Sequence, residues 1–290
     1  MNRITQPDNP HRRLRLVVSD MDGTLLNENK EISHRTLAAI AALRECGILF
    51  TVCTGREYAM LEHYARQIQP TAPMICNNGG EVIRYPQGEV ICRRLMPKPE
   101  TLSLVKLCFA EGIDFCVTTP EGAYFPAGSS MTGFYREHQQ KMRQEGLRGF
   151  PVRYISSQQE LSGLPLNKMI FRTDLTATEK AVRYIRQELT VFDTTMSSEF
   201  ILEVIPCGMN KAQGLKRLCE YLGITPAECC AVGDYENDTE LLKLAGLSVA
   251  MENGQPAVKS IADFVTASND REGVALLLEQ LVKEYAPIRE

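Results

Sequence analysis

Short apolar runs alternate with helical patterns near both ends of the chain. Six runs predict buried strands, at residues 15–18, 48–53, 74–76, 229–232, 247–250 and 264–266. Between them, apolar side chains recur every three or four residues, as on one face of a helix. The first of these helices has Ser33 as its expected N-cap and Gly47 just after its end. This alternation predicts an α/β fold, a doubly wound parallel sheet covered by helices on both faces.

The middle of the chain has a different pattern. Strands come there in close pairs, at 114–118 with 123–126 and at 191–197 with 200–205, and helical stretches at 99–111, 133–144 and 177–189 separate them. Hairpins of this kind predict a partly antiparallel α+β domain. We therefore expect a disordered tail at 1–13, a discontinuous core domain at 14–83 and 206–290, and an inserted α+β cap domain at 84–205.

Polar residues and glycines follow the first four predicted parallel strands, at 20–23, 54–56, 77–80 and 233–234. In open α/β sheets, ligands bind outside the carboxyl ends of the strands. Loops are usually polar, so four turns could share this character by chance. Their composition is nevertheless selective, because two carry carboxylates and the others carry hydroxyl, guanidinium and amide groups. Together they predict a site for a metal ion and an oxyanion.

Asp20 and Asp22 stand two positions apart in "SDMDG". In extended backbone such residues point to the same side, so both carboxylates can face one cavity. Two like charges this close need a cation or a shared proton. The alternative interpretation is an Asx turn that caps the strand.

A second acidic turn follows the fourth strand, in "GDYENDTELL" at 233–242. Its oxygen-bearing side chains suit a hard cation such as Mg²⁺. Acids and asparagine also cap helix N-termini, so both interpretations stay open for Asp234 and Asp238. Lys211 begins a predicted helix, where the helix dipole disfavours a cation and where it could neutralise a phosphate. Taken alone, it could equally be a surface lysine.

Composition excludes several classes of protein. The net charge of −4 and a pI near 5.7 argue against a nucleic-acid binder. No apolar run approaches the ~18 residues of a membrane span, and the first residues lack the apolar core of a secretory signal. The ten cysteines show no zinc spacing, and we expect reduced thiols in a cytoplasmic protein. Cys229 and Cys230 could form a redox pair, but opposite faces of one strand are the favoured interpretation.

The motifs, in this order, resemble those of the haloacid dehalogenase superfamily of phosphatases, in particular its Cof-type members with a large α+β cap. The resemblance is carried by "DMDGTLL" at 20–26, "TGR" at 54–56, Lys211 and "GDYEND" at 233–238. The "NNGG" at 77–80 and the segment "DFVTASNDREGVALLLEQL" are also similar to segments of that family. The resemblance covers nearly the whole chain after residue 13.

The resemblance implies a role for each matching residue. Asp20 would be the nucleophile that becomes an aspartyl phosphate, and Asp22 the general acid and then the general base. Phosphoryl oxygens would be held by the residues Thr54, Gly55, Lys211 and Asn237. A Mg²⁺ ion would be bound by Asp20, Asp22 through its carbonyl, and Asp234, with Asp238 supporting the metal site.

These roles imply a Mg²⁺-dependent phosphatase for small phosphorylated metabolites, with the cap as a lid. The partner is then a small metabolite, with no nucleic acid or membrane, and the chain is expected to be a monomer or weak homodimer. Two alternatives stay open: a phosphotransferase or phosphomutase with the same aspartyl phosphate, and a non-catalytic phospho-ligand-binding protein. Substrate contacts are suggested at Arg56, Asn78, Lys168 and Arg172, with solvated surface charges as the alternative for the two cap residues.

Two positions depart from the family pattern. Ala212 follows Lys211 where glycine is expected, and "AMENG" at 250–254 replaces the usual Met-Gly-Asn-Ala. Glu252 adds a negative charge near the predicted site, and the placement of Asn253 is open. These departures bear on the surroundings of the site and not on the reaction.

Overall fold

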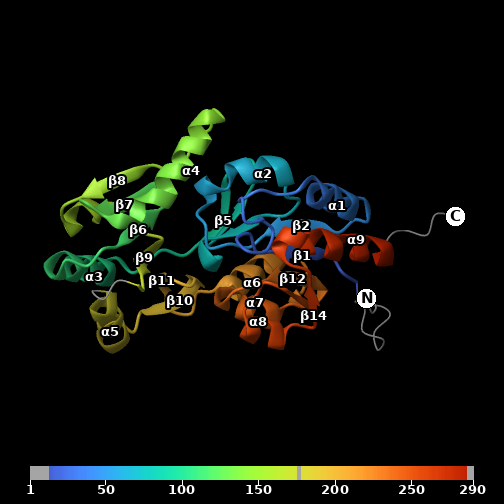
Figure 1. Cartoon of the computed structure of the whole chain (residues 1–290). Helices are drawn as coiled ribbons and strands as arrows, with labels where there is room; N and C mark the ends of the chain where they lie inside the picture. The colour runs from blue at the N-terminus through green and yellow to red at the C-terminus, as the bar shows by residue number, and fades with distance from the viewer. Residues whose placement is uncertain (1–12, 175–177, 286–290) are drawn as a thin grey trace. The chain divides into compact units, whose positions relative to one another are not determined.

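The computed structural model describes residues 13–174 and 178–285, and these fall into two compact units (Figure 1). The first unit takes in the described chain up to Thr54, then Tyr64–Cys92 and the chain from Asn210. The second unit comprises Gly55–His63 and Arg93–Met209. The predicted disordered tail lies, except for Arg13, outside the described residues.

A five-stranded sheet forms the centre of the first unit, in the order β14-β13-β12-β1-β2. Its strands are β1 (Leu16–Ser19), β2 (Leu49–Val52), β12 (Cys229–Gly233), β13 (Leu247–Met251) and β14 (Phe264–Thr266). Each strand of this sheet pairs with its neighbours in parallel, so the predicted α/β core is confirmed. β1 is wholly buried and pairs with β12 on one side and β2 on the other.

Helices cover both faces of this sheet (Figure 1). They are α1 (His34–Glu45), α2 (Glu62–Ile68), α6 (Lys211–Leu222), α7 (Thr239–Leu244), α8 (Pro256–Ile261) and α9 (Gly273–Tyr285). α1 and α9 lie side by side, whereas α6, α7 and α8 pack with the other side of β1 and β12. The Ser33 hydroxyl accepts a hydrogen bond from the Thr36 amide, which confirms the predicted start of α1.

The third predicted strand is only loosely attached to the parallel sheet. β3 (Met74–Cys76) pairs antiparallel with β4 (Glu81–Arg84) in a small sheet that continues to β5 (Glu89–Arg93). It meets β2 through a single parallel bridge between Cys53 and Ile75. The predicted parallel direction of this strand is thus confirmed at that bridge, but β3 forms its sheet with β4 and β5 and not with the five parallel strands.

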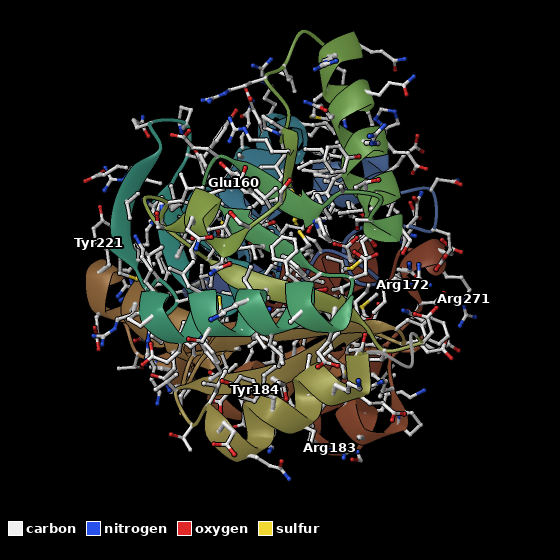
Figure 2. All side chains as sticks on the ribbon, turned by 90° about the vertical axis from the view of Figure 1, so that its left-hand side faces the viewer. Glu160, Arg172, Arg183, Tyr184, Tyr221 and Arg271 are labelled. Atoms are coloured by element: carbon white, nitrogen blue, oxygen red, sulfur yellow. The ribbon has the colours of Figure 1, made fainter. Side chains whose placement is uncertain are left out.

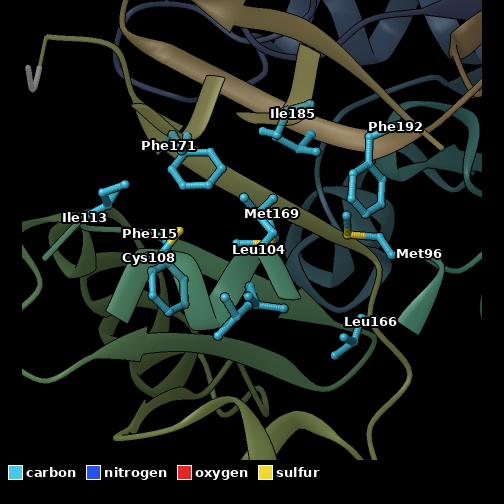
Figure 3. Close-up of a cluster of buried hydrophobic side chains, with 14 of the residues drawn as sticks. Met96, Leu104, Cys108, Ile113, Phe115, Leu166, Met169, Phe171, Ile185 and Phe192 are labelled. Atoms are coloured by element: carbon cyan, nitrogen blue, oxygen red, sulfur yellow. The ribbon is translucent and has the colours of Figure 1, made fainter. Parts of the chain in front are cut away.

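The second unit is built on a six-stranded sheet in the order β10-β11-β9-β6-β7-β8. Its elements are α3 (Lys98–Glu111), β6 (Cys116–Thr119), β7 (Gly122–Pro126), α4 (Gly133–Gln144), β8 (Val152–Ile155), β9 (Lys168–Arg172), α5 (Thr178–Glu188), β10 (Phe192–Ser198) and β11 (Ile201–Pro206). The two predicted hairpins, β6–β7 and β10–β11, are antiparallel. Leu104 of α3, Met169 of β9 and Ile185 of α5 point toward one another in its core (Figure 3).

The limits of the two units differ from the predicted 83/84 and 205/206. Residues 84–92 belong to the first unit because β5 extends the small sheet of β3 and β4. Residues 55–63 group with the second unit, since Met60 packs in a cluster with Cys116 and Phe125 of its sheet. Such contacts join residues far apart in the sequence, so the apolar pattern alone did not indicate them.

The cysteines are all free thiols. Cys229 packs in the cluster that includes Ala231, two positions on, while Cys230 between them is outside that cluster. This alternation confirms that the adjacent pair points to opposite faces of β12. The neighbour of Cys229 is Cys219 of α6, with 3.6 Å between the two sulfur atoms. None of the helices in the described part of the chain has the length and apolar character that a membrane span requires.

Candidate active site

The turn after β1 carries both predicted acids. Register places Ser19 opposite Val52 on one side and Val232 on the other, so the three strands end at the same edge of the sheet. The Asp20 amide donates to the Val232 carbonyl at 2.9 Å, and the Asp20 side chain is buried. Asp22 is partly exposed, and its Oδ1 lies 3.2 Å from Lys30 Nζ.

Lys211 is the first residue of α6 and lies between two carboxylates. Its Nζ donates to Asp20 Oδ1 and to Asp238 Oδ1, each at 2.6 Å, and its side chain is only 1% exposed. The interpretation as a surface lysine is therefore wrong. The Asn210 side chain caps α6 by accepting from the Gln213 amide, which fixes the helix start at Lys211.

The close packing of the Gly79 backbone against the start of α6 explains why a glycine stands at this position. Gly79 has φ +88°, and a Cβ there would lie 2.1 Å from the Asn210 carbonyl oxygen and 3.0 Å from the Gly214 amide nitrogen. The left-handed turn after β3 is thus seated on the first turn of α6. This contact holds the backbone from which Lys211 extends.

The turn that follows β12 adds Asp234 and Asp238 to the group around Lys211. Asp238 Oδ2 accepts from the amides of Asp234 and Tyr235, at 3.0 and 3.2 Å. Asp234 Oδ1 accepts from the Thr24 hydroxyl at 2.6 Å. Asp238 therefore caps the turn, as one of its two interpretations expected, and also binds Lys211; its role at a metal site stays a prediction.

Three buried carboxylates, Asp20, Asp234 and Asp238, each place one oxygen within 4.8 Å of the others. With Lys211 they carry a formal charge of −3 + 1, or −2, when all are ionised. Burial and the neighbouring carboxylates raise the pKa of Asp234 to about 7, and burial raises the pKa of Asp20 well above its usual value despite Lys211. Burial opposes the charge of Lys211, but its two aspartates together raise its pKa. This excess negative charge, presented on hard oxygens, suits a divalent cation.

The remaining predicted residues of the first unit form a hydrogen-bonded chain beside these acids. Thr54 is buried, its amide donates to the Ile75 carbonyl, and its carbonyl accepts from the Asn78 amide. The Asn78 side-chain oxygen accepts from Asn237 Nδ2 at 3.1 Å. Hydrogen bonds therefore connect Thr54, Asn78 and Asn237. The first and last were predicted to bind phosphate, and Asn78 was predicted to contact the substrate.

The other predicted residues, Gly55, Arg56, Lys168 and Arg172, belong to the second unit. Lys168 is buried and donates to the Gly55 carbonyl and to Glu203 Oε1, both at 2.6 Å, so its interpretation as a solvated charge is wrong. Arg56 lies over the Phe134 ring, 5.5 Å from the ring centroid. Arg172 is partly exposed at the end of β9 and pairs with Asp174 (Figure 2).

The departures from the family pattern have local explanations. Glu252 forms an ion pair with Arg271, which neutralises the added charge. Asn253 donates to the Gly23 carbonyl at 2.8 Å, so its side chain contacts the turn that carries Asp20. Ala212 is buried in the first turn of α6.

Sequence reasoning missed Thr24 and Asn269, whose side chains bond to Asp234 and to the Leu26 carbonyl. Thr24 lies two positions after Asp22, and its hydroxyl was the available signal. Asn269 lies in a segment noted only as a whole. No periodicity pointed to either residue.

The chain is similar to known proteins of one family. The model of the haloacid dehalogenase-like hydrolase family matches residues 17–278. A similar protein is 5-amino-6-(5-phospho-D-ribitylamino)uracil phosphatase YitU of Bacillus subtilis, 29% identical over 91% of this chain and 96% of its own length. The phosphatase of the same description from Escherichia coli, YbjI, is 26% identical over 94% and 98%.

The fold also has solved counterparts. A haloacid dehalogenase-like hydrolase from Bacteroides thetaiotaomicron is 26% identical and superposes with a TM-score of 0.80, covering 93% of this chain and all of that one. The resemblance that the motifs indicated therefore extends over both units of the chain.

Proposed function

Because the chain belongs to the haloacid dehalogenase-like hydrolase family, we propose that it is a phosphoric monoester hydrolase for small phosphorylated metabolites, with Asp20 as nucleophile. The observation that carries the proposal is the buried group of Lys211 with Asp20, Asp234 and Asp238. Phosphoryl transfer to a carboxylate requires positive charge beside the carboxylate and the phosphate, which Lys211 supplies in part and a cation held by the surplus carboxylates would complete.

Mg²⁺ is the proposed metal. Asp20, Asp234 and the backbone carbonyl of Asp22 would hold it, with Asp238 in support. The donor set fits, because it offers hard oxygen atoms and a formal charge of −2. When bound, the ion supplies positive charge that lowers the repulsion between a carboxylate and a phosphate.

The chain's own residues divide the remaining work. Lys211 fixes Asp20 through its Oδ1, which leaves Oδ2 to attack phosphorus while the bond to the leaving oxygen breaks. Lys211 and Thr54 would then hold the phosphoryl oxygens. Asp22 would give its proton to the leaving oxygen and take one from the water that attacks the phosphorylated Asp20. This reuse of one group as acid and then base needs a residue that exchanges protons with solvent, and Asp22 is partly exposed.

Substitution of the nucleophile tests the reaction. Asp20→Asn should lower phosphate release from para-nitrophenyl phosphate by at least roughly 10⁴-fold, because the amide is not a nucleophile. Asp263→Asn is the matched control, since Asp263 precedes β14 and contacts Ser248 at the opposite edge of the sheet. Chelation of divalent cations should abolish release by the wild type. Turnover retained by Asp20→Asn would overturn the role of Asp20.

The proposed substrate is a phosphate monoester of a sugar or sugar-like alcohol. Two relatives are named for a ribityl phosphate, which supports this class. A panel of sugar, polyol and nucleoside monophosphates, compared by kcat/KM, tests it. Preference for an aryl phosphate over all of these would count against the class.

The phosphotransferase alternative differs in the acceptor of the phosphoryl group. In the presence of an added sugar, the hydrolase should release inorganic phosphate equal to the substrate consumed. A shortfall, with phosphorylated sugar in its place, would favour the transferase. A non-catalytic binding protein would release no phosphate from any member of the panel.

A further inference from the structure

We infer that Asn269, acting together with Asn253, is a positioning residue for the turn that carries Asp20 and Asp22. The inference rests on the proposed function, because the position of this turn matters to catalysis only if Asp20 and Asp22 carry out the reaction. Within the turn, the two asparagine side chains contact backbone carbonyls. Both asparagines lie in loops after neighbouring strands of the parallel sheet, Asn253 after β13 and Asn269 after β14.

Side-chain amides from these loops hold two carbonyls of the catalytic turn. Asn269 Nδ2 donates to the Leu26 carbonyl at 3.0 Å, and Asn253 Nδ2 donates to the Gly23 carbonyl at 2.8 Å. The asparagines are also joined to each other, because the Asn269 amide donates to Asn253 Oδ1 at 3.0 Å. Asn269 is 9% exposed, so its bond to Leu26 is largely shielded from water.

Two further contacts join the same segments. The Glu28 amide donates to Asp270 Oδ1 at 2.9 Å, directly beyond the turn. Glu252, next to Asn253, forms an ion pair with Arg271, two residues after Asn269. Arg271 lies at the surface (Figure 2). The loops after β13 and β14 therefore hold the catalytic turn along its length.

The turn transmits this restraint to the acids. The Leu26 amide donates to the Met21 carbonyl at 2.8 Å, and Met21 stands between the two aspartates. At Gly23 a Cβ would lie 2.5 Å from Asp234 Oδ2, so the turn passes directly against that carboxylate. A displacement of the turn changes the separation of the oxygens of Asp20 and Asp234. A side-chain amide does not ionise near neutral pH and is neither a general acid nor a general base, so the asparagines act through position alone.

Asn269→Asp tests this role with little change in size. The backbone bond to Asn253 remains, but the donor that faces the Leu26 carbonyl becomes an acceptor. We expect kcat for para-nitrophenyl phosphate to fall about 10- to 100-fold, and the half-saturating Mg²⁺ concentration to rise by about the same factor, with a smaller change in substrate KM. Asn253→Ala should show the same changes to a lesser degree, because Asn253 is exposed.

Asn27→Asp is the matched control, since Asn27 lies just beyond the same turn and its side chain accepts from the Glu31 amide, which an aspartate can also do. Two readouts do not depend on turnover. Mg²⁺ affinity measured by calorimetry should fall in Asn269→Asp, and amide hydrogen exchange of the metal-free protein should become faster in residues 20–28 while the core strands keep their protection.

The outcomes separate this inference from the proposed function. If Asn269→Asp retains wild-type kcat, Mg²⁺ affinity and exchange in residues 20–28, the positioning role is wrong. A uniform increase of exchange over the whole chain would also overturn it, because that result indicates a general loss of stability. If the wild type itself releases no phosphate, the proposed function fails, and calorimetry and exchange still decide the role of Asn269.

Discussion

The two units each contain a lysine that is buried between carboxylates. In the first unit Lys211 binds Asp20 and Asp238, and in the second Lys168 binds Glu203. The nitrogen-to-oxygen distances are 2.6 Å in all three pairs. Geometry at the lysine therefore does not distinguish a catalytic group from a structural one.

The difference lies in the charge around each lysine. Asp234 adds a third carboxylate to the group of Lys211, which leaves an excess of negative charge. Around Lys168, the second acid is Glu57, whose Oε1 is 3.9 Å away and whose pKa is raised by burial. Counted in the same way, with every acid ionised, the second group carries −2 + 1, or −1, while the first carries −2 and places three carboxylate oxygens within 4.8 Å of one another. The first group therefore has the larger excess of negative charge, on an arrangement of oxygens that suits a divalent cation.

The two lysines also differ in where they lie and in which groups they bind. Lys211 stands where three parallel strands end, and its partners come from turns that follow β1 and β12. Lys168 Nζ also donates to the Gly55 carbonyl, and this bond connects the segment after Thr54 to the sheet of the second unit. We interpret the first lysine as part of the chemistry and the second as a support for the backbone.

Removal of the two lysines should give contrasting results, with the larger effect on catalysis at Lys211. Lys211→Met should lower kcat for an aryl phosphate by about 10²- to 10³-fold or more, because a preorganised charge beside the phosphoryl oxygens is lost. Steady-state kinetics, with circular dichroism to confirm folding, measure it. A folded variant with near wild-type kcat would place Lys211 outside the chemistry.

Lys168→Met should act mainly on stability. It leaves Glu203 buried without its partner, and breaking a buried pair in this way costs about 3–5 kcal/mol of unfolding free energy. Urea denaturation measures the loss. The double variant with Glu203→Gln should recover part of it, and no recovery would show that the ion pair is not the cause.

The ionisation of Asp234 should make Mg²⁺ binding depend on pH. Its pKa is raised to about 7, so protons compete with Mg²⁺ for its oxygen below that value. The half-saturating Mg²⁺ concentration should rise by up to about tenfold for each unit of pH below 7 and level off above it. Asp234→Asn, if it binds Mg²⁺ at all, should lose this dependence. A flat profile in the wild type would contradict the assignment of Asp234 as a ligand.

The smallest expected effect is on the metal-free protein. An unfolded aspartate loses its proton near pH ~4, while Asp234 in the fold retains it to about 7, so the folded state binds more protons in between. Stability should therefore fall as pH rises over that interval. Asp234→Asn should be more stable than wild type at alkaline pH, on the order of 1–3 kcal/mol, in thermal unfolding without metal.

The core strands and the acids of the candidate site could be predicted because their signals are local. An apolar run that ends in Asp20 and Asp22, and a second acidic turn at Asp234, are visible in the sequence itself. The N-cap of α1 at Ser33 was equally local.

The features that were missed depend on contacts distant in sequence. The membership of residues 55–63 in the second unit rests on Met60 packing against a sheet formed much later in the chain. Asn269 acts on the carbonyl of Leu26, and neither residue signals the other. The burial of Lys168 likewise depends on Glu203, which stands in a strand with an ordinary apolar pattern.

The central claim is that Asp20 accepts the phosphoryl group. The direct test uses Asp22→Asn with para-nitrophenyl phosphate, whose leaving group departs without an acid, so that loss of the water-activating carboxylate lets the phosphoenzyme accumulate. After acid quenching and borohydride reduction, peptide mass spectrometry should locate the modification at Asp20. Its location at any other residue would contradict the account.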